Sequence, residues 1–279
     1  MSLWLASVAS RNAAPRAQHV ESSHKNWRFA HRLALLGLVA LFALLQWKFA
    51  WSCDDSFISF RYARNFARGA GLLYNLGEAP PVEGYTNFLW VLFLTPFEAL
   101  GADVPLVAKW TSALCGCALV LLVARVLTTR FGASRATWCA LIAFASLPPL
   151  AVWSTSGLET MPFALALFGA FAALHAPRPK TALAACAAAL AVLLRADGFV
   201  AVTFVLAASA AGAGLREDRA ALRAIALAAA TIVVVLVGHL LWRHSYYGAW
   251  QPNTARVKVE FGALAFERDD RYPTARTML

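Results

Sequence analysis

The chain has 279 residues, of which 60% are hydrophobic and only 14% are charged. This composition excludes an ordinary soluble domain, in which about 25% of residues are charged. The net charge of +10 does not indicate nucleic-acid binding, because the basic residues lie in short connections between apolar blocks and form no single patch. We expect an all-α integral membrane protein, since the apolar blocks approach the length of a helix that crosses about 30 Å of hydrocarbon.

The N-terminal tail, residues 1–32, is polar and basic, and an apolar run at 33–51 follows it. The positive-inside rule predicts that the tail lies in the cytoplasm and that the first helix runs outward as a retained signal anchor. Two adjacent acids, Asp54 and Asp55, follow this helix within the stretch "CDDSFISFRYARN". They are expected to emerge on the far side of the membrane.

An amphipathic helix is predicted after the two acids, because the arginines of "SFISFRYARNFARG" share one helical face and its apolar residues share another. We expect this helix to lie along the outer surface of the membrane. Arg64 and Arg68 are expected to meet lipid headgroups there, whereas Arg61 is a candidate phosphate ligand.

A short apolar block at 87–102 allows two topologies, since it contains Pro96 and Glu98. As a membrane span, it would place the Arg-rich loop "RVLTTRFGASR" outside the cell. As an interfacial or re-entrant helix on the outer side, it places that loop inside. We favour the second topology, because every later connection then also obeys the positive-inside rule.

Seven membrane spans follow from this choice, at 33–51, 105–127, 136–153, 160–176, 180–195, 198–215 and 221–242. The predicted organisation is a cytoplasmic tail (1–32), a transmembrane module (33–242) with its first outer loop at 52–104, and an outer loop with a C-terminal tail (243–279). In this topology nearly every polar motif falls on the outer face. Such a gathering is expected of a site assembled from distant parts of a sequence.

The acid pair after the first span has both a structural and a functional interpretation. Either acid can cap the following helix. Two adjacent acids at the end of a membrane span are costly, which favours a function: one of them can cap while the other acts as a base.

Other outer-face residues also keep two interpretations. Glu159 in "SGLETMP" stands at a predicted helix start, where an acid is favoured electrostatically. Arg195 and Asp197 in "LRADG" can form an ion pair with each other. The motif "YYGAWQPNT" begins with two tyrosines that fit an interfacial aromatic belt. The motif "VEGYTN" offers Glu83, Tyr85 and Asn87 beside a glycine turn.

No motif for a metal or cofactor accompanies these residues. The five cysteines and six histidines show no paired ligand spacing, and the sequence contains no Walker loop, GxGxxG or GxSxG. We therefore expect no cofactor, and a divalent metal has no support in the sequence.

Together these motifs resemble the C-type glycosyltransferase superfamily, and most of all its bacterial terminal β-(1→2)-arabinofuranosyltransferase-like branch. The resemblance covers about residues 45–258 and rests on "DDSFISFRYARNFARGAGLLYNLGE", "VEGYTNFLWVLF", "VWSTSGLETMPFALALF", "LLRADGF" and "YYGAWQPNT". It implies a multi-pass enzyme of the bacterial cytoplasmic membrane whose catalytic acid lies in the first outer, periplasmic loop. Its implied partners are a polyprenyl-phosphate sugar donor, a glycan or glycolipid acceptor of the cell envelope and the lipid bilayer, with no nucleic acid.

The resemblance implies that Asp54 is the catalytic base, with Asp55 beside it orienting a substrate. One base is chemically sufficient, because a polyprenyl phosphate leaves as a stabilised anion and a single displacement inverts the anomeric carbon. The sugar is best taken as arabinofuranose. The candidate substrate-binding residues are Arg61, Glu83, Tyr85, Glu159, Arg195, Asp197, Tyr246, Tyr247, Asn253 and Lys258.

Two alternatives stay open at this point. Family members continue with further helices and an outer domain, so this chain is also compatible with a truncated or frameshifted copy that has lost activity. A transporter is the other alternative. It predicts ionisable residues or broken helices at mid-membrane, whereas the charges here lie near the ends of the predicted spans.

Overall fold

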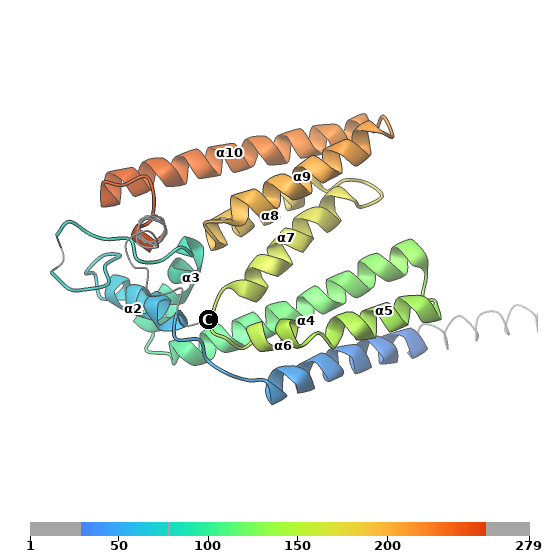
Figure 1. Cartoon of the computed structure of the whole chain (residues 1–279), viewed down its shortest axis with the longest axis horizontal. Helices are drawn as coiled ribbons and strands as arrows, with labels where there is room; N and C mark the ends of the chain where they lie inside the picture. The colour runs from blue at the N-terminus through green and yellow to red at the C-terminus, as the bar shows by residue number, and fades with distance from the viewer. Residues whose placement is uncertain (1–28, 78, 255–279) are drawn as a thin grey trace, which may run out of the picture.

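The computed structural model describes residues 29–77 and 79–254, and no strand occurs among them (Figure 1). Three helices are long and apolar enough to cross a membrane: the first helix (Phe29–Lys48), α4 (Val104–Phe131) and α10 (Arg219–Tyr247). The chain is therefore an all-α membrane protein, as its composition predicts.

The remaining helices are shorter than the predicted spans require. They are α2 (Ser56–Ala67), α3 (Phe88–Ala99), α5 (Arg135–Ala145), α6 (Pro148–Trp153), α7 (Thr160–Leu174), α8 (Thr181–Leu194) and α9 (Gly198–Gly214). The seven-span arrangement accordingly stays a prediction. One span predicted as continuous, 136–153, is divided into α5 and α6, because Pro148 stands in the first turn of α6 and cannot continue the preceding helix.

Local sequence signals fix several of the helix starts. The side chains of Asp103, Ser134 and Asp218 each accept a hydrogen bond from a backbone N–H in the first turn of α4, α5 and α10, respectively. Glycines with positive φ follow α4 and α10, at Gly132 and Gly248. These caps explain why both long helices start and stop close to where the apolar pattern does.

The helices form an elongated bundle, with α2 and α3 gathered at one end (Figure 1). The first helix, α4 and α5 lie along one side, and α7 to α10 along the other. From α6 onward successive helices reverse direction, so the start of α7 and the ends of α8 and α10 all come back to the end where α2 and α3 lie. We call this region the α2/α3 end.

Separate apolar cores hold the two sides and the α2/α3 end together. Leu38 and Phe42 of the first helix pack with Val120 of α4 and Leu141 of α5. The other side is built largely from alanines of α7, α8 and α10, which let these helices approach closely. At the α2/α3 end, Tyr62, Trp90, Leu94 and Tyr247 belong to one buried cluster that fastens α2 and α3 to α10.

A tight crossing joins the first helix, α4 and α6 at Gly116. A Cβ atom on Gly116 would lie 2.7 Å from Ser154 Oγ, 3.0 Å from Gln46 Nε2 and 3.1 Å from Phe42 Cε1. The buried Gln46 side chain donates a hydrogen bond across the same crossing to the Ala113 carbonyl, at 3.1 Å. A side chain at position 116 would therefore force these neighbours to shift.

Replacing Gly116 by valine should destabilise the protein by about 1–3 kcal/mol through overpacking. Gly238→Val on α10 is the matched control, because no atom lies within 4 Å of a Cβ at that position. Thermal unfolding in detergent should give a lower midpoint for Gly116→Val than for Gly238→Val. Equal midpoints would show that the crossing is not tight.

Candidate functional site

Asp54 and Asp55 lie in the turn between the first helix and α2, with both side chains exposed. Asp55 occupies the N-cap position of α2 but makes no side-chain capping hydrogen bond, whereas Asp54 Oδ1 accepts one from the Asp55 N–H at 3.0 Å. Within residues 29–77 and 79–254, neither carboxylate forms an ion pair. Both acids therefore face solvent, and no cation of the described residues neutralises them.

The turn that carries the acids is held in place by a backbone hydrogen bond and close packing with the segment 154–159. The Cys53 N–H donates to the Ser156 carbonyl at 2.9 Å, and the Ser56 hydroxyl donates to the Cys53 carbonyl at 2.6 Å. Gly157 has a φ of +85°, and a Cβ there would lie 3.1 Å from Ser56 Oγ. The acids are thus exposed side chains on a fixed backbone.

Cys53 precedes the acids and is itself buried. Burial raises the pKa of its thiol, and the neighbouring Asp54 adds to that rise. The ligand atoms of Cys53, Asp54 and Asp55 all lie within 4.8 Å of one another, close enough to hold a metal ion. Sequence reasoning did not anticipate this grouping, and exposed acidic groups are common without a metal.

Glu159 is buried close to this turn and contacts side chains from two other segments. Its Oε2 accepts a hydrogen bond from Asn87 Nδ2 at 2.7 Å, and its Oε1 lies 3.4 Å from Arg195 Nη1. Asn87 in turn exchanges hydrogen bonds with the Ser59 hydroxyl of α2. Burial raises the pKa of Glu159, while the hydrogen bond from Asn87 acts in the opposite direction. The carboxylate therefore connects α2, α3, α7 and α8.

Arg195 and Asp197 form the ion pair expected from "LRADG". Arg195 Nε and Nη2 contact the two carboxylate oxygens of Asp197 at 2.9 and 3.1 Å. These hydrogen bonds lower the pKa of Asp197. Because Arg195 also contacts Glu159, one guanidinium bridges a buried carboxylate and an exposed one at the end of α8.

The loop between α2 and α3 is fastened to the last turns of α10. Glu83 and Arg243 are both buried and form an ion pair, with 2.6 Å between Oε2 and Nε and 3.1 Å between Oε1 and Nη2. Burial raises the pKa of Glu83, and the hydrogen bond from Arg243 opposes that rise. The pair thus ties a long loop to a membrane-spanning helix.

Both tyrosines of "YYGAWQPNT" contact the same loop. The Tyr247 hydroxyl donates to the Leu72 carbonyl at 3.0 Å and lies 3.1 Å from the Tyr85 hydroxyl. Burial raises the pKa of Tyr85. The Tyr246 hydroxyl accepts a hydrogen bond from the Leu72 N–H at 2.9 Å. In this structure Tyr85, Tyr246 and Tyr247 therefore shape the loop.

The remaining predicted substrate ligands lie around this loop or outside the described residues. Arg61 donates to the Tyr74 carbonyl at 2.8 Å and to Asn75 Oδ1 at 3.3 Å, and stays exposed. The backbone N–H of Asn253 donates to the Glu83 carbonyl at 3.0 Å. Lys258 lies outside the described residues.

Exposed tryptophans surround the α2/α3 end. Trp47 and Trp51 lie at the end of the first helix, Trp110 in the second turn of α4 and Trp153 at the end of α6. Tryptophan is enriched at membrane–water interfaces. The exposed tryptophans thus lie at the same end of the bundle as the acid pair.

The site thus brings together Asp54, Asp55, Glu159, Arg195 and Asp197 at one end of the bundle. Sequence reasoning singled out Asn87 in "VEGYTN" but missed Ser59 and Arg243. Arg243 carried a detectable signal, because it directly follows a predicted span and is charged. Ser59 carried none, since its importance comes from a contact with Asn87, which lies 28 positions away.

Comparison with known proteins gave no match to a family model, a curated protein or a solved structure.

Removing one partner of the buried pair should destabilise the protein strongly. Arg243→Gln leaves the Glu83 carboxylate buried without its cation, a change that typically costs about 3–5 kcal/mol. Adding Glu83→Gln to this variant should restore part of the loss. The measurement is a thermal-unfolding double-mutant cycle in detergent.

Arg64→Gln is the control for this cycle, because its contact with Glu98 is 3.7 Å long and the Arg64 side chain is half exposed. Such pairs contribute about 0–1 kcal/mol. A loss for Arg243→Gln no larger than that for Arg64→Gln would contradict the role of the buried pair.

Proposed function

We propose that the protein is an inverting membrane glycosyltransferase that moves a sugar, with arabinofuranose as the best candidate, from a polyprenyl-phosphate donor to a cell-envelope glycan or glycolipid. The observation that carries the proposal is the solvent-facing pair Asp54 and Asp55. Neither forms an ion pair within the described residues, and both stand on a backbone fixed by the segment 154–159. A general base requires this combination of access and fixed position.

The proposed reaction is a single displacement. The Asp54 carboxylate takes the proton of an acceptor hydroxyl while the hydroxyl oxygen forms a bond to the anomeric carbon. The bond between that carbon and the phosphate oxygen breaks, and its electron pair leaves with the polyprenyl phosphate. No general acid is needed for this leaving group, unlike in glycoside hydrolysis.

Arg195 is the best candidate to bind the leaving phosphate. Its side chain is about one-third exposed (35%), and its partner Asp197 is more exposed still, at 68%. A phosphate can therefore replace Asp197 on the outer edge of the guanidinium while Glu159 continues to hold the inner edge. Arg61 is a second exposed guanidinium on α2, held against Tyr74 at 4.3 Å.

The membrane setting of the acids supports a lipid-linked donor. The exposed tryptophans support a position of the α2/α3 end at a membrane surface, and α2 also exposes Phe57 and Phe66 beside its arginines. A headgroup phosphate at this level can reach the acids while its polyprenyl chain stays in the bilayer. We further propose seven spans, a cytoplasmic N-terminus and a site on the outer, periplasmic face of the bacterial inner membrane.

Asp54→Asn should lower sugar transfer from a polyprenyl-phosphate donor by roughly 10²- to 10⁴-fold, the usual contribution of a general base. The assay follows radiolabelled sugar into the glycan fraction of membranes that contain the full-length protein. Asp103→Asn is the control, since Asp103 is an exposed acid at the start of α4 and asparagine also caps helices well. Full transfer by Asp54→Asn would refute the role of Asp54.

The orientation can be tested with single-cysteine variants. Cys53 is buried, so an impermeant maleimide should not label it, although it stands beside the acids. Ser52→Cys, at an exposed position in a chain without other cysteines, should be labelled in intact spheroplasts. Labelling of this variant only after lysis would place the acids in the cytoplasm and contradict the proposed topology.

A further inference from the structure

The guanidinium of Arg195 is shared between two carboxylates that differ in burial. Glu159 is buried and accepts a hydrogen bond from Arg195 Nη1 at 3.4 Å. Asp197 is exposed and accepts hydrogen bonds from Nε at 2.9 Å and from Nη2 at 3.1 Å. Arginine binds phosphate through the same two parallel N–H groups. Asp197 therefore occupies the edge of the guanidinium that a phosphate would use.

The guanidinium keeps two other supports when Asp197 moves away. Glu159 holds Nη1 and is itself fixed by the hydrogen bond from Asn87 at 2.7 Å. The guanidinium carbon also lies 5.6 Å from the centre of the Phe163 ring, within the range of a cation–π contact. Arg195 is thus a preformed anion site whose outer edge is filled by the chain's own carboxylate.

Asp197 can leave Arg195 only by rotating its side chain. The following residue, Gly198, packs so closely on α8 that a Cβ there would lie 2.5 Å from the Ala191 carbonyl oxygen. The backbone of this turn therefore has no room to move toward α8. An exposed ion pair is easily exchanged, because water solvates both partners once they separate. After the exchange the negative charge of Asp197 still lies near the bound phosphate.

This retained charge repels a phosphate in proportion to the phosphate's own charge. A polyprenyl-phosphate sugar is a phosphodiester with one negative charge. The polyprenyl phosphate left after the transfer is a monoester, whose charge at pH 7 is about −1.5 to −2 because its second pKa is near 6. Asp197 therefore disfavours the spent lipid more strongly than the donor.

We propose that Asp197 is a release group, which competes with phosphate for Arg195 and expels the spent polyprenyl phosphate in preference to the donor. The inference rests on the proposed transfer from a polyprenyl-phosphate sugar and adds the step that follows it. Without a competitor, loss of the sugar would raise the charge of the phosphate and strengthen its contact with Arg195. With Asp197 present, the carboxylate returns to the guanidinium as the lipid leaves.

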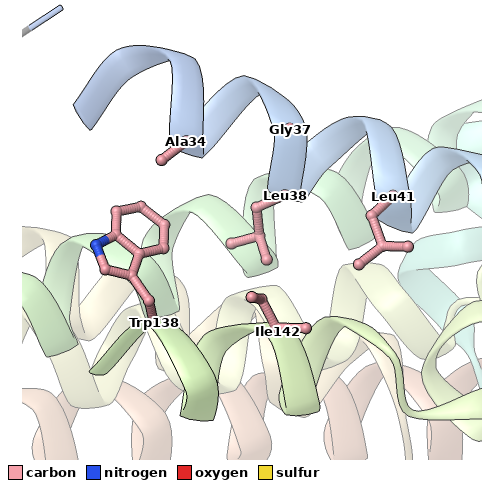
Figure 2. A pocket seen from close by; sticks show the side chains of 6 residues that line it. All are labelled: Ala34, Gly37, Leu38, Leu41, Trp138 and Ile142. Atoms are coloured by element: carbon pink, nitrogen blue, oxygen red, sulfur yellow. The ribbon is translucent and has the colours of Figure 1, made fainter. Parts of the chain in front are cut away.

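An apolar groove in the other half of the bundle offers space for hydrocarbon but no charge. Figure 2 shows this groove between the first helix and α5, where Leu38, Leu41 and Ile142 are among its lining residues. Its volume is about 380 Å³. An isoprenoid tail can enter such a groove without any contact between its head group and Arg195. Ligands with one tail and different head groups therefore isolate the phosphate contact.

Three farnesyl ligands, titrated into the full-length protein in detergent at neutral pH, test the role of Asp197. Farnesyl phosphate represents the spent lipid, farnesyl methyl phosphate represents the singly charged donor, and farnesol reports binding of the tail alone. Isothermal titration calorimetry gives the Kd of each. Asp197→Asn should tighten binding of farnesyl phosphate about tenfold and of farnesyl methyl phosphate about threefold, because the monoester carries the larger charge.

Three variants serve as controls. Asp197→Glu keeps the negative charge and should bind both phosphates as the wild type does. Asp103→Asn removes a different exposed acid and should change neither Kd, since asparagine also caps α4 well. Arg195→Gln should bind farnesyl phosphate no better than farnesol. Asparagine also suits the N-cap position that residue 197 occupies in α9, so Asp197→Asn keeps this helix start.

The possible failures separate this inference from the proposed function. Equal tightening of both phosphates by Asp197→Asn, or no tightening of either, would overturn the release role and leave the proposed transfer standing. A wild type that binds farnesyl phosphate no better than farnesol does not by itself decide, because Asp197 opposes binding. If Asp197→Asn also shows no preference for the phosphate, the contact at Arg195 is refuted, and both the phosphate role of Arg195 and the release role fall.

Discussion

The buried carboxylate of Glu159 is the contact on which the α2/α3 end depends. It receives a hydrogen bond from Asn87 at 2.7 Å and faces Arg195 at 3.4 Å, and Asn87 continues the network to Ser59. One side chain therefore links four segments: the starts of α3 and α7, the end of α8 and, through Asn87, α2. A buried charge is tolerated only when it is paired and hydrogen-bonded, so these segments are held in a single arrangement. The turn with Asp54 and Asp55 is hydrogen-bonded to the segment 154–159, which ends at Glu159.

The bilayer explains why the polar groups gather at the helix ends. Backbone groups in hydrocarbon must be satisfied within helices, and charged side chains are costly at the bilayer centre. Glu83, Glu159 and Arg243 are the buried charged residues of the described chain, and all three lie at the α2/α3 end. Arg243 and Glu83 fasten a loop there, whereas Asp54 and Asp55 stay exposed. The same constraint leaves the far half of the bundle apolar, with charge only at its rim.

The helices were predictable from sequence more accurately than their contacts. Apolar runs and turn residues placed α7, α8 and α9 within two residues of the observed bounds, because each run is bracketed by polar residues. The break before Pro148 was missed, since the run continues through it. The pair Arg195 and Asp197 was predictable because its members are two residues apart. The pairs Glu83 with Arg243 and Tyr85 with Tyr247 join residues about 160 positions apart, and no local pattern reveals such contacts.

The proposed reaction is a single displacement that one exposed carboxylate drives at the membrane surface. Its most direct test is the anomeric configuration of the sugar that the full-length protein transfers, read from NMR coupling constants of the product made from a donor of defined anomeric configuration. A single displacement with Asp54 as base predicts complete inversion. Retention of configuration would require a covalent sugar intermediate or a second displacement, and would contradict the account.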